Sequence, residues 1–387
     1  MEILCVGGAV RDELLGRPVS DRDWVVVGAT PEQMESRGFR PVGRDFPVFL
    51  HPQTHEEYAL ARTERKVSPG YRGFVVHSSP DVTLDDDLRR RDLTINAMAR
   101  AADGTLIDPW GGLSDLRAKR LRHVSDAFAE DPVRILRLAR FAARFADFTV
   151  APETLALARA MVDAGEADAL VAERIWQEIS RGLMESTPSR MLSVLDQCGA
   201  LSRILPALGA AASPTRRDWR STLNRLALAA GQRASLAVRY ALLAGWPREP
   251  DVAQDCSARM RAPSDCAELA RLIADHGRAK PLAAAAPELA SLMEGIDALR
   301  RPDRAIEFIR VCAYRDGAAP DRQAETAQAI VAALRTVDAG AIAAAARQQL
   351  PDARESATRI REALRIARAA AIAACLQSLT SPNHSDP

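Results

Sequence analysis

Two carboxylates near the N-terminus have the spacing of a metal-binding pair. Asp21 and Asp23 stand directly before the apolar residues 24–27, three of which are valine. On an extended strand, side chains at positions i and i+2 point to one face, and two like charges held there need a cation between them. Since Mg²⁺ prefers carboxylate and phosphate oxygens, the pair predicts a Mg²⁺ site for a phosphate-bearing substrate. Two solvated aspartates at a hairpin end would have the same spacing.

A glycine turn precedes this pair in the sequence. Residues 3–6 are apolar and predict a short strand, Gly7 and Gly8 predict a turn, and residues 9–15 predict a helix. Backbone amides at the start of a helix attract anions. We expect Gly8 to let the backbone approach a triphosphate, and Arg11 to reach the same phosphates. A simple turn without a ligand is the alternative.

A segment rich in arginine, residues 130–144, predicts a helix with a basic face. At about 100° per residue, four arginines lie within a face about 120° wide. These are Arg134, Arg137, Arg140 and Arg144. An apolar face adjoins them, and Asp131 lies near the helix start. The spacing alone is equally typical of a surface helix with a solvated basic side.

In combination, these motifs resemble the class II tRNA nucleotidyltransferases, that is, the CCA-adding enzymes and their poly(A) polymerase relatives. The matching blocks are, in order, Gly-Gly-Ala-Val-Arg-Asp, Asp-Arg-Asp-Trp, Arg-Arg-Asp-Leu-Thr-Ile-Asn-Ala, Asp-Pro-Trp-Gly-Gly and Glu-Asp-x-x-Arg-x-x-Arg. The resemblance covers roughly residues 1–210 and fades beyond them. It implies template-independent addition of CMP and AMP from CTP and ATP to the 3′ end of tRNA.

The resemblance also implies roles for the acidic residues of the first half. Asp21 and Asp23 would hold two Mg²⁺ ions, and Glu57, on a later strand, is the candidate for a third catalytic carboxylate. Arg91 would contact the sugar and the phosphates of the nucleotide. Asp92 would orient the neighbouring arginines or the ribose hydroxyl.

The basic helix would read the base. C and A each present an amine donor beside a ring-nitrogen acceptor, whereas U and G present a carbonyl beside an N–H. Asp131 would accept from the amine and Arg134 would donate to the ring nitrogen, so that the wrong bases leave buried groups unpaired. Arg137 and Arg140 would hold phosphates or the ribose.

The resemblance implies an α+β chain in four parts. Residues 1–122 would form a polymerase-β-like nucleotidyltransferase head with a mixed sheet, and residues 123–210 a helical neck with the base-reading helix. Residues 211–377 would form an all-α body and tail, and residues 378–387 a disordered end. Thr30 and Pro31 predict a helix start. The apolar positions of residues 84–98 predict one helix, and another is predicted from Glu130.

One departure from the family concerns the second half. Some bacterial relatives continue into a metal-dependent HD phosphohydrolase domain, which needs a His-Asp dipeptide among clustered ligands. At the corresponding place this chain has Ala244 and Gly245, and His276 is the only histidine between His123 and His384. We therefore expect a degenerate HD-like region without phosphohydrolase activity, which contacts tRNA by shape and backbone.

Composition sets the remaining expectations. The chain has 387 residues, 47% of them hydrophobic, and a formal net charge of +1, so RNA contacts must come from local basic patches. Six scattered cysteines without Cys-x-x-Cys fit reduced thiols in the cytoplasm. We expect no membrane span, no signal peptide, and a monomer or weak homodimer.

Two other functions fit the same residues. A poly(A) polymerase on the same head would add many A residues and ignore C. A catalytically inactive tRNA-binding protein is conceivable because the second half is altered, but the complete acidic pair and the intact reader motif argue against it.

Overall fold

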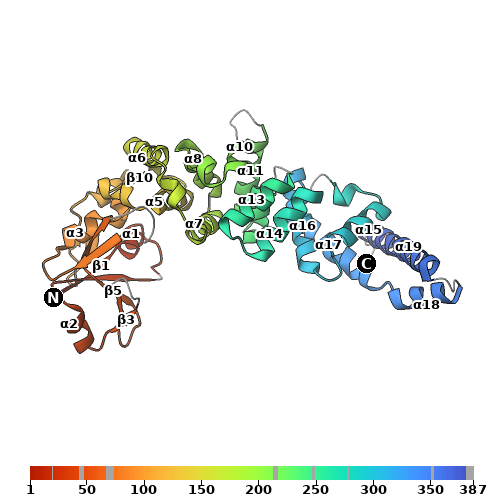
Figure 1. The fold of residues 1–387 in the computed structure, drawn as a ribbon, viewed down its shortest axis with the longest axis horizontal. Coiled ribbons are helices and arrows are strands. Elements are labelled where there is room, and N and C mark those ends of the chain that lie inside the picture. The colour runs from red at the N-terminus through yellow and green to blue at the C-terminus, as the bar shows by residue number, and fades with distance from the viewer. Residues whose placement is uncertain are drawn as a thin grey trace, which may run out of the picture. The chain divides into compact units, whose positions relative to one another are not determined.

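The computed structural model describes residues 1–19, 21–42, 48–66, 74–211, 217–245, 249–276, 279–349 and 353–380. The chain divides into two compact units, residues 1–210 and residues 211–387, which are coloured from red to yellow-green and from green to blue in Figure 1. The first unit combines a sheet with helices, and the second is helical throughout its described part. This confirms the predicted α+β class, with a mixed sheet at the N-terminus followed by helices.

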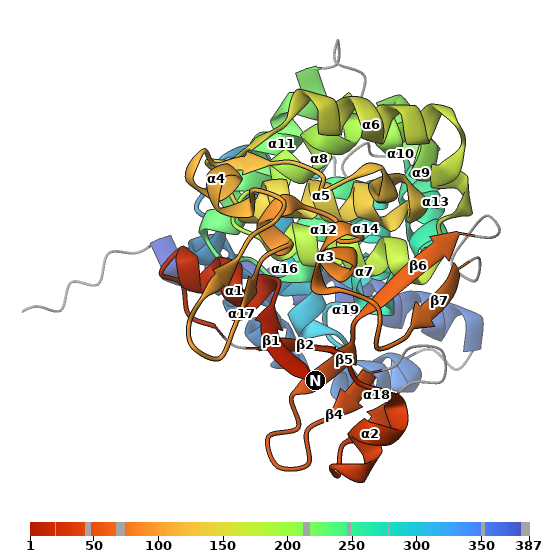
Figure 2. The ribbon, with the colours of Figure 1, turned by 90° about the vertical axis from the view of Figure 1, so that its left-hand side faces the viewer.

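Seven of the described strands form one sheet, in the order β3-β4-β5-β2-β1-β8-β9. Its strands are β1 (Glu2–Val6), β2 (Asp23–Val27), β3 (Arg40–Val42), β4 (Val48–Leu50), β5 (Glu57–Leu60), β8 (Ala99–Arg100) and β9 (Leu106–Ile107). β2 runs antiparallel to β1 but parallel to β5, so the sheet is mixed. Figure 2 shows a separate hairpin beyond the end of β5, formed by β6 (Arg62–Lys66) and β7 (Phe74–Ser78). A further parallel pair joins β10 (Arg120–Leu121) and β11 (Thr149–Val150).

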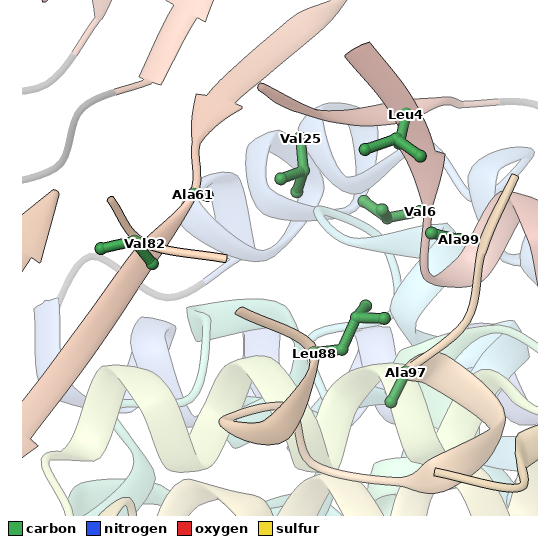
Figure 3. Close-up of a cluster of buried hydrophobic side chains, with 8 residues drawn as sticks. All are labelled: Leu4, Val6, Val25, Ala61, Val82, Leu88, Ala97 and Ala99. Carbon is green, nitrogen blue, oxygen red and sulfur yellow. The ribbon is translucent and has the colours of Figure 1, made fainter. Parts of the chain in front are cut away.

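Alternation along the strands gives the sheet two apolar faces. Val25 belongs to a cluster with Leu4 and Val6, whereas its neighbour Val26 packs in a second cluster on the other face. Figure 3 shows the first cluster, in which the strand residues lie on the side of the sheet nearer to Leu88. Asp23 is two residues before Val25, so this face also carries the acidic end of β2.

Helices cover the first cluster and continue the first unit. They are α1 (Gly8–Leu14), α2 (Pro31–Ser36), α3 (Leu84–Arg89), α4 (Gly112–Arg117), α5 (Val133–Arg144), α6 (Pro152–Asp163), α7 (Ala172–Met184), α8 (Pro188–Gln197), α9 (Ala200–Ile204) and α10 (Pro206–Ala211). The predicted start of α2 is confirmed, because Thr30 and Gln33 form a reciprocal capping box and Pro31 is the first helical residue.

Two predicted helix boundaries are wrong. The helix expected over residues 84–98 ends at Arg89, because Asp92 accepts a hydrogen bond from the backbone N–H of Leu93, which is extended and pairs with His123. The helix expected from Glu130 begins at Val133 instead. Residues Asp126–Glu130 form a 3₁₀ turn, and Asp131 is extended.

The second unit consists of nine helices in its described part. These are α11 (Arg217–Gly231), α12 (Leu236–Ala244), α13 (Pro250–Met260), α14 (Ser264–His276), α15 (Ala286–Gly295), α16 (Pro302–Asp316), α17 (Pro320–Arg335), α18 (Ala339–Gln349) and α19 (Ala353–Thr380). The prediction of a disordered end from residue 378 is wrong for its first three residues, which complete α19. Residues 381–387 lie outside the described chain.

Across the described ranges, no individual helix combines the length and apolar character that crossing a membrane would require. The pair α17 and α18, bent by 42° at their junction, meets the criterion only when taken together, by length and composition.

Candidate active site

A cavity of about 470 Å³ in the first unit gathers most of the predicted site residues. Among the described residues its wall carries eight arginines but only three aspartates, so it suits a polyanion. The residues that form the wall are Gly7, Gly8, Arg11, Asp23, Arg90, Arg91, Asp92, Asn96, Asp131, Arg134, Arg137, Arg140, Phe141, Arg144 and Arg174.

Asp23, the first residue of β2, lies in the wall of this cavity, whereas Asp21 and Glu57 are not among the residues that form the wall. Asp23 lies in register with Glu57 across the parallel pair of β2 and β5, so both side chains leave the sheet on the same face. Asp21, Asp23 and Glu57 are all exposed. Across the described residues, no group of three or more His, Cys, Asp or Glu side chains is close enough to hold a metal ion. Carboxylate oxygens at this place are of the kind that a hard cation prefers, and substrate phosphates would add further oxygens.

The glycine turn also lies in this wall, and Gly7 is its constrained residue. Gly7 has φ 72°, and a Cβ there would lie 2.8 Å from Nη1 of Arg91. A Cβ on Gly8 would meet nothing nearer than Arg11, at 3.5 Å. The turn thus lets Arg91 lie against the backbone, a role that the sequence gave no reason to assign to Gly7.

Arg11 lies in the wall with most of its donors engaged by the protein. It is 3% exposed. Its Nε and Nη2 each donate to a carboxylate oxygen of Asp12 at 2.8 Å, and its Nη1 donates to Asn96. Burial lowers the pKa of Arg11, against the opposing effect of Asp12. Its guanidinium also lies over the rings of Phe141 and Phe145.

A buried aspartate orients the two arginines that follow α3. Asp87 is 0% exposed. Its Oδ1 accepts from Nη2 of Arg90 at 2.8 Å, and its Oδ2 accepts from Nη2 of Arg91 at 3.2 Å. Burial would raise the pKa of Asp87, but the two arginines outweigh it and lower the pKa. Asp86, one residue earlier, makes the helix cap with Thr83.

Asp92 connects this corner of the cavity to α5. It is buried, and its two oxygens accept from the backbone N–H of Leu93, from Nδ2 of Asn96 at 2.9 Å and from Nε of Arg137 at 2.7 Å. Burial acts to raise its pKa, but Arg137 and the hydrogen bonds outweigh this and hold the pKa far below its usual value. Asp92 thus orients an arginine, but this is Arg137 on α5, whereas the neighbouring Arg90 and Arg91, which the prediction meant, are held by Asp87. The Arg137 side chain is still 36% exposed.

The arginines predicted to share one face of α5 all reach the cavity. Like Arg137, the last two are anchored from outside the helix: Nε of Arg140 donates to Glu178 at 2.6 Å, and Nη2 of Arg144 donates to Asp12 at 2.8 Å. Arg140 is only 8% exposed. The adjoining side of α5 is apolar and buried, as the periodicity predicted, with Ile135, Leu138 and Ala142 on the helix and Phe145 directly after it.

The predicted base-reading pair lies at the start of α5. Nη1 of Arg134 donates to the backbone oxygen of Ala127 at 2.5 Å. Oδ1 of Asp131 accepts from the backbone N–H of Val133 at 3.0 Å. The Asp131 carboxylate also accepts from both Nη atoms of Arg174, at 3.2 and 3.0 Å. Asp131 and Arg134 therefore lie in the same cavity wall as Asp23.

Sequence reasoning missed Asp87 and Arg174. Asp87 stands in a run of three aspartates in the first turn of α3, and only its burial distinguishes it. Arg174 lies 43 residues from Asp131 along the chain. Its place in the first turn of α7 gave no signal of a partner that far away.

Family models match two parts of the first unit. Residues 3–122 match the model described as Poly A polymerase head domain. Residues 147–211 match the model described as probable RNA and SrmB-binding site of polymerase A.

Relatives of similar length match nearly the whole chain. The chain is 54% identical to a protein named Multifunctional CCA protein from Burkholderia multivorans, over 97% of this chain and 99% of that protein. It is 55% identical to a protein of the same name from Azoarcus sp. strain BH72, with 89% and 92% covered.

Solved structures share the fold. A Bacillus stearothermophilus CCA-adding enzyme in complex with CTP aligns with TM-score 0.68 at 23% identity, over 97% of this chain and 93% of that one. A Thermotoga maritima CCA-adding enzyme complexed with tRNA aligns with TM-score 0.64 at 20% identity, over 98% and 91%.

Proposed function

This chain belongs to the family of the multifunctional CCA proteins, and from that premise we propose that it adds CMP and AMP from CTP and ATP to the 3′ end of tRNA. The reaction builds or repairs the CCA terminus without a nucleic-acid template and releases pyrophosphate. One observation carries the proposal: a single arginine-rich cavity is lined by Asp23, at the acidic end of β2, and by the Asp131–Arg134 pair. Transfer and inspection of the base can then take place on the same bound nucleotide.

Asp21 and Asp23 are the residues that would hold Mg²⁺, with Glu57 beside Asp23 as the additional carboxylate. When bound there, Mg²⁺ lowers the pKa of the RNA 3′-hydroxyl and neutralises charge on the pyrophosphate leaving group. The exposed carboxylates at the cavity edge suit such an ion, because hard cations prefer oxygen ligands and retain several waters.

The arginines hold the triphosphate and the sugar. Arg91, fixed by Asp87 and placed against the Gly7–Gly8 turn, contacts the sugar and phosphates. Arg137, oriented by Asp92, offers the more exposed guanidinium for a phosphate or the ribose, and Arg140 and Arg11 add positive charge from the buried wall. Contacts of this kind are common to CTP and ATP, because both nucleotides have the same triphosphate and ribose.

Asp131 and Arg134 select the base. A carboxylate accepts from the exocyclic amine of C or A, and a guanidinium donates to the adjacent ring nitrogen. U and G place an acceptor and a donor at the opposite positions, so both contacts fail. Each buried group left unpaired costs about 1–3 kcal/mol, which makes the pair an effective filter.

The remaining elements of the proposal concern partners and setting. The helical second unit, together with residues 123–210, holds tRNA by its shape and backbone. We expect the chain to act in the cytoplasm as a monomer or weak homodimer. A poly(A) polymerase is disfavoured, because the relatives at 54% and 55% identity are CCA proteins.

The experiment uses α-labelled CTP, ATP, UTP and GTP, each supplied singly and in mixtures. The substrates are tRNAs that end before CCA, after the first C and after the second C, and the products are read on a sequencing gel. We expect two C residues from CTP alone, one A on the tRNA ending in C-C, and a halt after CCA. A long A ladder on any of these tRNAs would identify a poly(A) polymerase. No extension in the presence of retained tRNA binding would identify an inactive binder.

A further inference from the structure

Arg174 makes a bidentate contact with the carboxylate of Asp131, the proposed base reader. It lies in the first turn of α7, and its Nη1 and Nη2 donate to Oδ1 and Oδ2 of Asp131 at 3.2 and 3.0 Å. Both side chains are largely covered, with 28% exposure for Arg174 and 20% for Asp131. Paired contacts of this type fix the plane of a carboxylate as well as its charge.

The contact also determines which acceptor of Asp131 remains for a nucleotide. A carboxylate has about four lone-pair positions. The described contacts occupy three of them, namely the two from Arg174 and the one from the backbone N–H of Val133 to Oδ1. One position is left, on Oδ2, and it suffices for the single amine hydrogen that C or A presents.

Arg174 further separates Asp131 from Arg134. Asp131 lies two residues before the first residue of α5 and Arg134 is its second residue, and both line the same cavity, where opposite charges attract one another. If they paired, the acceptor and the donor that the base needs would satisfy each other. With Arg174 on the carboxylate, the Arg134 guanidinium instead reaches the backbone oxygen of Ala127.

We propose that Arg174 is the positioning residue that sets base specificity, by holding the Asp131 carboxylate in one plane and with one acceptor directed to the incoming base. This proposal rests on the proposed role of Asp131 and Arg134 as base readers. Arg174 itself touches no reacting atom. Its loss lets the carboxylate rotate or pair with Arg134, so that an N–H of U meets an acceptor as readily as the amine of C does.

The test compares kcat/KM for CTP and UTP on tRNA that ends before CCA, and for ATP and GTP on tRNA that ends in C-C. The variants are Arg174→Gln and Arg174→Lys, with Arg181→Gln as control, since Arg181 is exposed on the same helix. In Arg174→Gln the preference for CTP over UTP falls by about tenfold or more. Arg174→Lys restores part of it, because an ammonium can hold one oxygen. Arg181→Gln keeps the wild-type preference.

A purely structural role for Arg174, tying α7 to the start of α5, would lower the rates for all four nucleotides in proportion and leave both ratios unchanged. That result would overturn the proposal. If Arg174→Gln does not fold, Arg174→Lys decides the question. An unaltered ratio of kcat/KM for CTP to that for UTP, with KM raised equally for both nucleotides, would also overturn the proposal.

Asp131→Asn separates this inference from the proposed function. If Asp131→Asn still prefers CTP to UTP as the wild type does, Asp131 is not a base reader. The proposed base reading by Asp131 and the inference on Arg174 are then both wrong. If Asp131→Asn loses the preference while Arg174→Gln keeps it, only the inference on Arg174 falls. When both residues act through one carboxylate, the double variant shows a preference no lower than that of Asp131→Asn alone.

Discussion

Gly7 is the backbone position where the cavity wall has no room for a side chain. In Gly7→Ala, the positive φ of 72° would cost about 1–2 kcal/mol, and the new Cβ, 2.8 Å from Nη1 of Arg91, would displace that guanidinium. We predict that KM for CTP and for ATP rises by about tenfold, equally for both because the displaced contact is to the shared sugar and phosphates. Steady-state kinetics with each nucleotide measures this.

Gly16 offers a matched control for this prediction. Its φ is 65° and a Cβ there would meet nothing within 4 Å. Gly16→Ala therefore carries the same kind of backbone strain without touching Arg91, and it should lose some thermal stability while keeping both KM values. A KM increase of equal size in the two variants would assign the effect to strain and not to Arg91.

The contacts of Asp92 predict that the stability of the folded chain depends on pH. In the folded chain the pKa of Asp92 is held far below its usual value, because Arg137 and two hydrogen bonds outweigh burial. The ionised form therefore stabilises the fold above the unfolded pKa of about 4, and this contribution is lost as the pH falls from there towards the folded pKa. We predict that Asp92→Asn is less stable than the wild type by about 2 kcal/mol at neutral pH.

Urea unfolding at several pH values tests this. The difference between the two midpoints should stay constant from pH 8 to pH 5 and shrink below about pH 4. A difference that is the same at pH 7 and at pH 3 would mean that the charge of Asp92 does not stabilise the chain.

The sequence pattern predicted some of these residues but not others, for a physical reason. The arginine face of α5 and the carboxylates beside β2 follow from periodicities of 3.6 and 2, which are local properties of the chain. Asp87 and Arg174 act through partners that only folding brings near. Nothing in the composition around them distinguishes a buried ion pair from a solvated charge.

At the scale of elements, helix ends were the least predictable features. α3 ends at Arg89 and α5 begins at Val133 because side chains of Asp92 and Asp131 accept hydrogen bonds from nearby backbone N–H groups. These competing hydrogen bonds outweigh helix propensity over a few residues. The strand over residues 3–6, the start of α2 and the buried face of α5 followed from hydrophobic pattern and capping residues and were predictable.

Gly245 provides a prediction on how helices pack in the second unit. It follows α12, and a Cβ there would lie 2.6 Å from the backbone oxygen of Ala270 on α14. Gly245→Ala should separate α12 from α14 and destabilise the chain by about 1–3 kcal/mol. Gly231→Ala, where a Cβ meets nothing within 4 Å, is the control and should leave thermal stability unchanged or raise it. Calorimetry that gives equal melting temperatures for wild type and Gly245→Ala would contradict this packing.

At the scale of the whole molecule, the second unit lacks the His-Asp dipeptide that an HD phosphohydrolase requires, since Ala244 and Gly245 stand at that place. The close approach of Gly245 to α14 leaves no room for an aspartate side chain there. We predict that the chain releases no phosphate from p-nitrophenyl phosphate and opens no 2′,3′-cyclic nucleotide, with Mg²⁺ or Ni²⁺ added, while CMP addition proceeds in the same preparation. Metal-dependent release that co-purifies with CMP addition would contradict this prediction.

The central claim is that the acidic end of β2 carries out nucleotide transfer in the cavity that also reads the base. The most direct test is Asp21→Ala, assayed with α-labelled CTP and ATP on tRNA lacking its CCA end and by a separate measurement of tRNA affinity. Glu35→Ala, an exposed carboxylate on α2, is the control. We predict that Asp21→Ala abolishes the addition of both CMP and AMP while tRNA affinity stays within about twofold of the wild type, and that Glu35→Ala retains full activity. Unchanged turnover in Asp21→Ala would contradict the account.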